Sequence, residues 1–187
     1  MSELVESFIE DCRRAERVHA ELADLVLDVA ERMGRLIEAA DSFLAPAHRR
    51  GDPQRYARNA IHISAGNGIS LFALVWQPGQ WTPIHDHGTW GVVGIVEGVL
   101  QERNYIRTDG YHGRDDGIEL RRGGITLLGP GSVSTFVPNP DHIHVTGVPA
   151  EAGAVLSLHL YGREMNNFNV YDLERGARQP IKVTYEV

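Results

Sequence analysis

The sequence changes character near residue 50, and this change constrains the fold more than any other feature. Up to about residue 45, apolar side chains recur at the three- and four-residue spacings of an amphipathic helix, as in Leu22, Leu25 and Val29. From about residue 56, short Val-, Ile-, Leu- and Tyr-rich runs alternate with Gly, Pro, Asn and Asp. Such runs without intervening helices are typical of antiparallel sandwiches and barrels. We therefore expect a mainly β fold with residues 1–50 as an N-terminal helical cap, residues 51–187 as a β-barrel, and a single structural domain overall.

Charge and cysteine content limit the partners of this chain. A formal net charge of −7 argues against nucleic acid or an anionic membrane surface as the main partner. The only cysteine, Cys12, excludes an intrachain disulfide and fits a reducing compartment. The acidic N-terminus does not resemble a signal peptide, and no apolar run is long enough for a membrane span. We expect a soluble cytoplasmic protein with no nucleic-acid or membrane partner, as a monomer or weak homo-oligomer.

The stretch TPIHDHGTWGVVGIVEG, residues 82–98, places His85 and His87 two positions apart. If it is a strand, side chains at i and i+2 share one face, roughly 6–7 Å apart along it. Two imidazoles placed in this way can bind one metal ion. They can also be neighbours on a polar face, so this motif alone leaves both interpretations open.

Two further segments favour the metal. His142 and His144 lie in the stretch PDHIHVTGV, and Ser157, His159 and Tyr161 alternate along SLHLYG, which is typical of one strand face. Histidine is the commonest metal ligand in proteins, so several histidines on neighbouring strands predict a metal site. Either histidine of the second segment could complete it.

These segments resemble the two motifs of the cupins. The first motif, a glycine, His-x-His, a glutamate and a second glycine, is matched by Gly79, His85, His87 and Gly98, and GGITLLGPGS followed by a histidine resembles the second. The resemblance implies a jelly-roll-like β-barrel. The chain departs from the pattern because no glutamate follows His87 at three or four residues; Glu97 lies too far along and is assigned a structural role.

A site of three neutral imidazoles differs chemically from one that includes a carboxylate. Both leave an open face on the metal, but the imidazoles leave its full +2 charge uncompensated. Such a site favours anionic co-ligands, of which a thiolate is the softest common example. A thiol substrate is therefore chemically natural.

Four stretches together resemble the cysteine dioxygenase family of cupin thiol dioxygenases: YARNAI, HDHGTWG, IHVTG and SLHLYG, within about residues 53 to 165. The resemblance implies an Fe(II) centre that oxidises a small thiol to a sulfinic acid with O2. It assigns His85, His87 and His144 as the iron ligands. The choice of His144 over His142 follows the family spacing, in which a Ser-His-Tyr triad lies 13, 15 and 17 residues after the third ligand.

The same resemblance implies roles for five other residues. Tyr161 would place its phenol beside the iron, with His159 fixing the phenol and Ser157 fixing the imidazole. Arg58 would bind the substrate carboxylate in a bidentate, charge-assisted pair, and Tyr56 would assist it. Arginine at this position marks family members that prefer cysteine, so L-cysteine is the expected substrate and cysteine sulfinic acid the expected product.

Two features are consistent with a thiol other than cysteine as the substrate. The tryptophan-rich texture around HDHGTWG is similar to bacterial 3-mercaptopropionate dioxygenases, and Val148 stands where the second motif usually has asparagine. His159 and Arg163 could also recruit a second carboxylate, as in mercaptosuccinate. Outside the enzymes, the alternative is a non-catalytic metal-binding cupin sensor with structural zinc or nickel.

Further expectations concern Gly91 and the remaining histidines. Some family members cross-link the tyrosine to a cysteine, but that position is Gly91 here, so no such cross-link is expected. His142 is expected to face solvent or support the ligands. His62 is expected to line the barrel, and polar loops are expected for His48 and His112.

Overall fold

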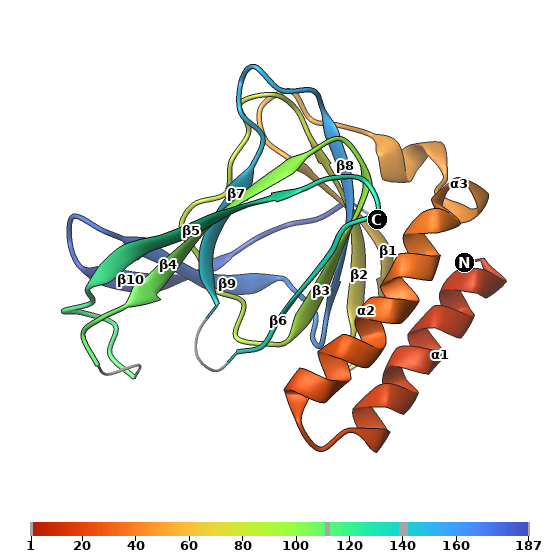
Figure 1. The fold of residues 1–187 in the computed structure, drawn as a ribbon, viewed down its shortest axis with the longest axis horizontal. Helices are drawn as coiled ribbons and strands as arrows, with labels where there is room; N and C mark the ends of the chain where they lie inside the picture. Colours follow the sequence, from red (N-terminus) through yellow and green to blue (C-terminus); the bar gives the residue numbers. More distant parts are fainter. Residues whose placement is uncertain (1, 111–112, 139–141, 187) are drawn as a thin grey trace.

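The computed structural model describes residues 2–110, 113–138 and 142–186 (Figure 1). All its helices precede its strands, which confirms the expectation of a mainly β fold with N-terminal helices. The helices are α1 (Glu3–Val18), α2 (Leu22–Glu38), α3 (Ala40–Phe43) and the 3-10 helix η1 (Pro46–Arg49). The strands are β1 (Ala57–Ile63), β2 (Ser70–Trp76), β3 (Gly91–Glu97), β4 (Leu100–Arg107), β5 (Leu120–Leu128), β6 (Val133–Phe136), β7 (Ile143–Gly147), β8 (Val155–Tyr161), β9 (Asn167–Asp172) and β10 (Ala177–Lys182).

The strands form separate sheets that are not closed into a barrel. One layer is the five-stranded sheet β1-β2-β8-β3-β6, and the other contains β5-β4-β7 and the hairpin β10-β9. Between β7 and β9, the segment 81–86 makes only isolated bridges, including His85 with His144 and with Val170. Pro83 lies in this segment and has no amide hydrogen to donate to a ladder. The second layer is therefore interrupted at this segment.

The helices cover the outer face of the five-stranded sheet, where α2 contacts β3 and β6 and α1 packs on α2 (Figure 1). Both helices bury an apolar stripe, which explains their stability in this position. Gly94 of β3 allows close approach, because a Cβ there would lie 2.7 Å from Ile37 Cγ2 and 2.9 Å from Met33 Cγ. The helical segment is thus anchored to the sheet that carries part of the site.

Strand β8 is buried along its whole length and separates two apolar clusters. Leu156, Leu158 and Leu160 face the cluster under the helices, and full burial of each such leucine stabilises the fold by about 1.5–3 kcal/mol. Tyr161, on the opposite face, joins the cluster between the two layers. Strand alternation therefore directs its polar residues, Ser157 and His159, toward the interior between the layers.

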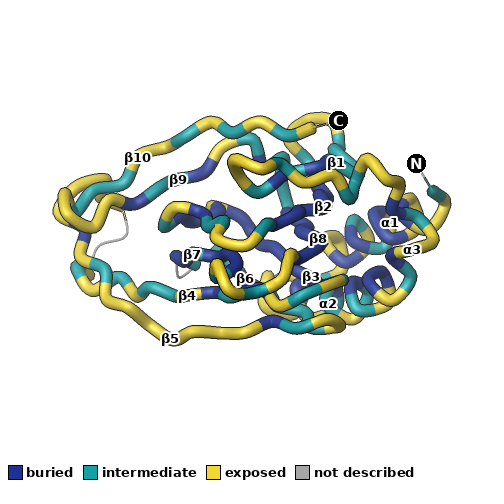
Figure 2. The backbone as a smooth tube through the Cα atoms, turned by 90° about the horizontal axis from the view of Figure 1, so that it is seen from above, coloured by how far each residue is buried: buried dark blue, intermediate teal, exposed yellow. Residues whose placement is uncertain are grey.

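Exposure differs sharply between the two layers. Figure 2 shows β8, β3 and β2 as buried strands in the middle of the molecule, whereas β5 forms an exposed outer edge. No helix within the described residues is long and apolar enough to cross a membrane.

Candidate metal centre

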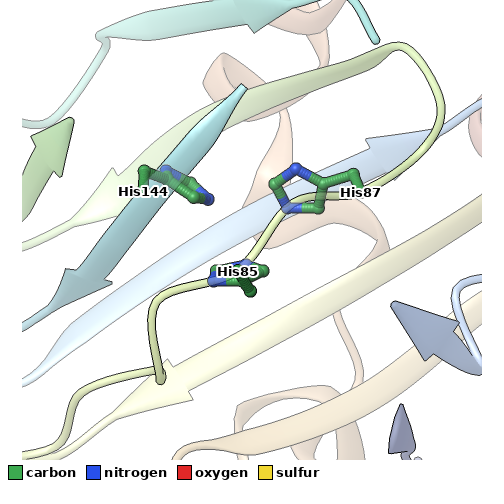
Figure 3. A group of neighbouring side chains, drawn as sticks. All are labelled: His85, His87 and His144. Atoms are coloured by element: carbon green, nitrogen blue, oxygen red, sulfur yellow. The ribbon is translucent and has the colours of Figure 1, made fainter. Parts of the chain in front are cut away.

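Three histidines converge between the layers. His85 and His87 lie in the irregular segment between β2 and β3, rather than on the regular strand considered above, and His144 lies on β7. One ligating nitrogen from each lies within 4.8 Å of the others. The ring centroids are 4.6 to 5.0 Å apart, and the side chains face one another (Figure 3). The structure therefore brings together the three predicted ligands at one point.

Backbone pairing explains how this segment is held against β7. His85 N–H donates to the His144 carbonyl over 2.9 Å, and His144 N–H donates to the His85 carbonyl over 3.0 Å. His85 Nδ1 lies 3.0 Å from the Pro83 carbonyl, so Nδ1 carries the hydrogen and Nε2 keeps its lone pair. His144 Nε2 is buried without a hydrogen-bond partner among the described residues. Both rings thus have a nitrogen available to a metal.

The electrostatics of the cluster favour neutral imidazoles. Burial lowers the pKa of His85 and His87 well below the ordinary histidine value, and the neighbouring histidines lower it further. Burial likewise lowers the pKa of His144. Neutral imidazole is the form that binds metals, and imidazole suits iron, zinc, copper and nickel. The donor set therefore fits a transition metal without selecting one of them.

Asp86, between the two histidines, points into a separate polar network that the sequence analysis missed. Its carboxylate accepts hydrogen bonds from Asn169 Nδ2 at 3.0 and 3.2 Å and from the Tyr171 hydroxyl at 2.8 Å. Arg178 Nη1 lies 3.9 Å away. These partners all lie on the β9–β10 hairpin, which therefore positions the histidine segment from its other side.

A chain of buried hydrogen bonds leads into the site from β2 and β8. Trp76 Nε1 donates to Ser157 Oγ over 2.9 Å, Ser157 Oγ lies 2.9 Å from His159 Nε2, and His159 Nδ1 lies 3.2 Å from the Tyr161 hydroxyl. The structure thus brings together Ser157, His159 and Tyr161 as expected, and adds Trp76. The indole N–H can only donate, so Ser157 Oγ is an acceptor in the first of these bonds.

The protonation states of these residues determine which of them donates in each hydrogen bond. Burial lowers the pKa of His159 to about 3, and burial raises the pKa of Tyr161 above its ordinary value, so both groups are neutral. Ser157 has one hydroxyl hydrogen, and His159 Nε2 is the acceptor that the described residues offer it. His159 then carries its hydrogen on Nδ1 and donates it to the tyrosine oxygen. The Tyr161 hydroxyl hydrogen remains free to donate to a bound molecule.

Arg58 and Tyr56 approach the histidines from β1 and the residue preceding it. Arg58 Nη2 donates to the Met165 carbonyl over 2.6 Å, whereas Nη1 is buried and has no hydrogen-bond partner in the described part of the chain. The guanidinium carbon lies 4.9 Å above the centre of the Phe72 ring. Tyr56 stacks on Trp76 with ring centroids 4.5 Å apart. One side of the guanidinium is therefore fixed, and the other is left for a ligand.

These groups line one small cavity of about 30 Å³. The predicted residues on its wall are Tyr56, Arg58, His85, His87, His144, His159 and Tyr161. Ser157 is not on the wall and lies behind His159. The unpartnered Nη1 of Arg58, the phenol of Tyr161 and the imidazoles of the three-histidine cluster thus face the same cavity. This cavity can hold a metal with a small anionic ligand.

Phe136 and Glu102 are two further neighbours that the sequence analysis missed. The Phe136 ring stacks on His87 with ring centroids 4.3 Å apart. A Cβ at Gly91 would fall 2.2 Å from Phe136 Cζ, so the Phe136 ring fills the space beside Gly91, where no cross-linking cysteine was expected. Glu102 lies beside His144 and His142, close to the ligands. Strand pairing brings both to the site, so no local motif could have identified them.

The other positions considered above lie elsewhere. Arg163 donates to the His87 carbonyl over 2.9 Å and to Asn167, so it holds the histidine segment instead of lining the cavity. His62 lies 2.8 Å from Ser64 Oγ and is not on the cavity wall. His48 lies in η1 rather than a loop, and His112 lies outside the described residues.

Comparison with solved structures gives similar but distant chains. A Thermus thermophilus protein shares 16% identity over 66% of this chain and 93% of its own, with a TM-score of 0.43. A Klebsiella pneumoniae protein with a double-stranded β-helix domain shares 14% over 66% and 85%, with a TM-score of 0.41. An RmlC-like cupin protein from Ralstonia eutropha shares 12% over 76% and 82%, with a TM-score of 0.44.

Family membership rests on the sequence itself. The family model for cysteine dioxygenase type I matches residues 27–174, from within α2 to just beyond β9. The matched range includes every residue of the three-histidine cluster and the residues around its cavity. Because the match covers most of the chain, the protein belongs to the cysteine dioxygenase type I family.

Proposed function

We propose that this protein is a non-haem Fe(II) thiol dioxygenase that converts a small thiol carboxylate, L-cysteine above all, to its sulfinic acid. The overall change is R–SH + O2 → R–SO2H, in which both oxygen atoms join the sulfur and the thiol supplies the electrons. The family assignment supports the reaction class. The observation that carries the proposal is that the unpartnered Arg58 Nη1 shares one cavity with the three histidines.

The metal and the arginine are complementary to the two ends of such a substrate. His85, His87 and His144 would hold the iron, which when bound supplies the redox chemistry that joins O2 to the sulfur. Arg58 would bind the carboxylate through Nη1 while Nη2 stays fixed on the Met165 carbonyl. Tyr56, held flat against Trp76, would limit how the bound molecule can turn.

The chain from Trp76 to Tyr161 would supply a directed hydrogen-bond donor. Because His159 donates to the tyrosine oxygen, the phenolic hydrogen points away from His159 and is available to an anionic or oxygen-bearing ligand in the cavity. The raised pKa of Tyr161, caused by burial, keeps that hydrogen in place. Preorganised donors of this kind stabilise developing charge without reorganisation.

The experiment that tests this proposal is O2 uptake by the Fe(II)-loaded protein with L-cysteine, 3-mercaptopropionate and mercaptosuccinate in parallel, with products identified by mass. Sulfinic acid formation with stoichiometric O2 uptake and a preference for cysteine supports the full proposal. Preference for another thiol acid would retain the reaction and overturn the substrate. No O2 uptake with any of the three would overturn the enzyme assignment and favour a metal-binding sensor.

A further inference from the structure

Glu102 of β4 is a buried carboxylate beside the metal centre. Its side chain is 10% exposed, with Oε2 3.3 Å from His144 Nδ1 and Oε1 3.5 Å from His142 Nε2. The described part of the structure gives this side chain no lysine or arginine partner. Burying an ionised carboxylate costs several kcal/mol unless it is compensated. The two imidazoles therefore account for its position.

The position of Glu102 is complementary to the charge of the proposed centre. Three neutral imidazoles leave the full +2 charge of a metal uncompensated, and no carboxylate is among them. Glu102 lies beside Nδ1 of His144 and thus on the far side of the ring from Nε2. A carboxylate behind a ligating histidine fixes its tautomer and raises its basicity toward the metal.

We propose that Glu102 is a positioning residue that holds His144 with its hydrogen on Nδ1, so that Nε2 presents its lone pair to the metal, and that it supplies the anionic charge which the ligand set lacks. This inference rests on the metal site of the proposed function. The 3.3 Å separation of Glu102 Oε2 and His144 Nδ1 lies within ion-pair range but outside good hydrogen-bond geometry.

His142 Nε2 lies near the other oxygen of the same carboxylate. Its ring lies nearly parallel to Phe136, 4.8 Å away at 6°, and Phe136 in turn stacks on His87. His142 is therefore fixed by a carboxylate on one side and an aromatic ring on the other. In this arrangement it supports Glu102 instead of serving as a fourth ligand.

The test is the affinity of the metal-free protein for Co(II), measured by chelator competition in wild type, Glu102→Gln and Glu102→Asp. Glu119→Gln is the control, because it makes the same charge change at an exposed position. Removing such a supporting carboxylate typically weakens metal binding by about 10–100-fold. We expect that loss in Glu102→Gln, a smaller loss in Glu102→Asp, and wild-type affinity in Glu119→Gln.

Equal affinity of Glu102→Gln and wild type would overturn the inference. So would binding of two Co(II) ions per chain that depends on Glu102, because Glu102, His142 and His144 would then be ligands of a second ion. A second measurement needs no variant: long-range ¹⁵N–¹H NMR of the metal-free wild type should show the His144 hydrogen on Nδ1. A hydrogen on Nε2 would contradict the assignment even if Glu102→Gln fails to fold.

These outcomes separate the inference from the proposed function. Tight, Glu102-dependent Co(II) binding in a protein whose iron form oxidises no thiol would support the role of Glu102 and overturn the reaction. Thiol oxidation by a protein whose metal affinity does not depend on Glu102 would support the reaction and overturn the role of Glu102.

Discussion

Trp76 and Ser157 are joined by a buried hydrogen bond of 2.9 Å across 81 residues of sequence. This bond occupies an acceptor site of the serine oxygen and leaves its hydroxyl hydrogen for His159. The tautomer of the histidine, and through it the direction of the Tyr161 hydroxyl, therefore depends on an indole on the neighbouring strand.

Trp76→Phe should reduce turnover because it removes the donor that orients Ser157. We expect kcat to fall by about 10–100-fold, as for other supporting hydrogen bonds of an active site. Loss of the bond and the smaller ring should also lower the free energy of unfolding by about 1–3 kcal/mol. Steady-state O2 uptake and urea unfolding measure the two effects. Unchanged kcat in a folded variant would show that the orientation of the Ser157 hydroxyl does not depend on the hydrogen bond from Trp76.

Arg58→Gln should weaken use of substrates that carry a carboxylate. Loss of a buried, charge-assisted pair costs about 2–5 kcal/mol, so we expect kcat/KM for L-cysteine to fall by about 30-fold or more. Cysteamine, which has the thiol and amine but no carboxylate, is the matched substrate control. Its kcat/KM should change little, and an equal loss with both substrates would mean that Arg58 acts on the fold or the metal instead.

Tyr161→Phe should separate catalysis from metal binding. The phenol donates toward the cavity but is not a ligand, so the variant should retain wild-type Co(II) affinity. Removing one preorganised donor typically lowers kcat by about 10²–10³-fold, and we expect a loss of this size. A variant with normal turnover would indicate that the freed hydroxyl hydrogen has no part in the reaction.

Metal-free protein should lose stability as the pH falls below about 6.5. The pKa of His159 in the folded state is about 3, against an ordinary value of 6.5, and the unfolded chain therefore binds more protons in this window. The contribution of His159 to stability is fully present at a pH above its pKa in the unfolded chain. It falls with decreasing pH, by up to about 1.4 kcal/mol per pH unit. His85, His87 and His144 act in the same direction.

The variant His159→Gln isolates one of these contributions. The slope of unfolding free energy against pH should be shallower than in wild type, by the equivalent of about one proton at pH 5 and about half a proton at pH 6.5. The upper part of this range avoids most carboxylate titration. Identical slopes would mean that His159 is not held neutral in the folded protein.

Local patterns predicted much of this site. Strand alternation placed Ser157, His159 and Tyr161 on one face, and the resemblance to the family selected His144 and Arg58, all of which the structure gathers around one cavity or immediately behind it. Their catalytic roles stay predictions.

Long-range pairing decided what the sequence could not show. Glu102 reaches His144 because β4 pairs with β7, and Asp86 is bound by a hairpin more than 80 residues later in the chain. For a related reason, the sequence could not show that the sheets are not closed into a barrel. The short runs indicated strands, but which edges meet depends on the irregular segment around Pro83, whose bridges to β7 and β9 no periodicity reveals.

The most direct test of the account is a single turnover of the iron-loaded protein with L-cysteine under ¹⁸O₂ in ordinary water, with the product analysed by mass. The account predicts cysteine sulfinic acid in which both oxygen atoms on sulfur are labelled. Cystine, or a product with one labelled oxygen and one from water, would contradict it.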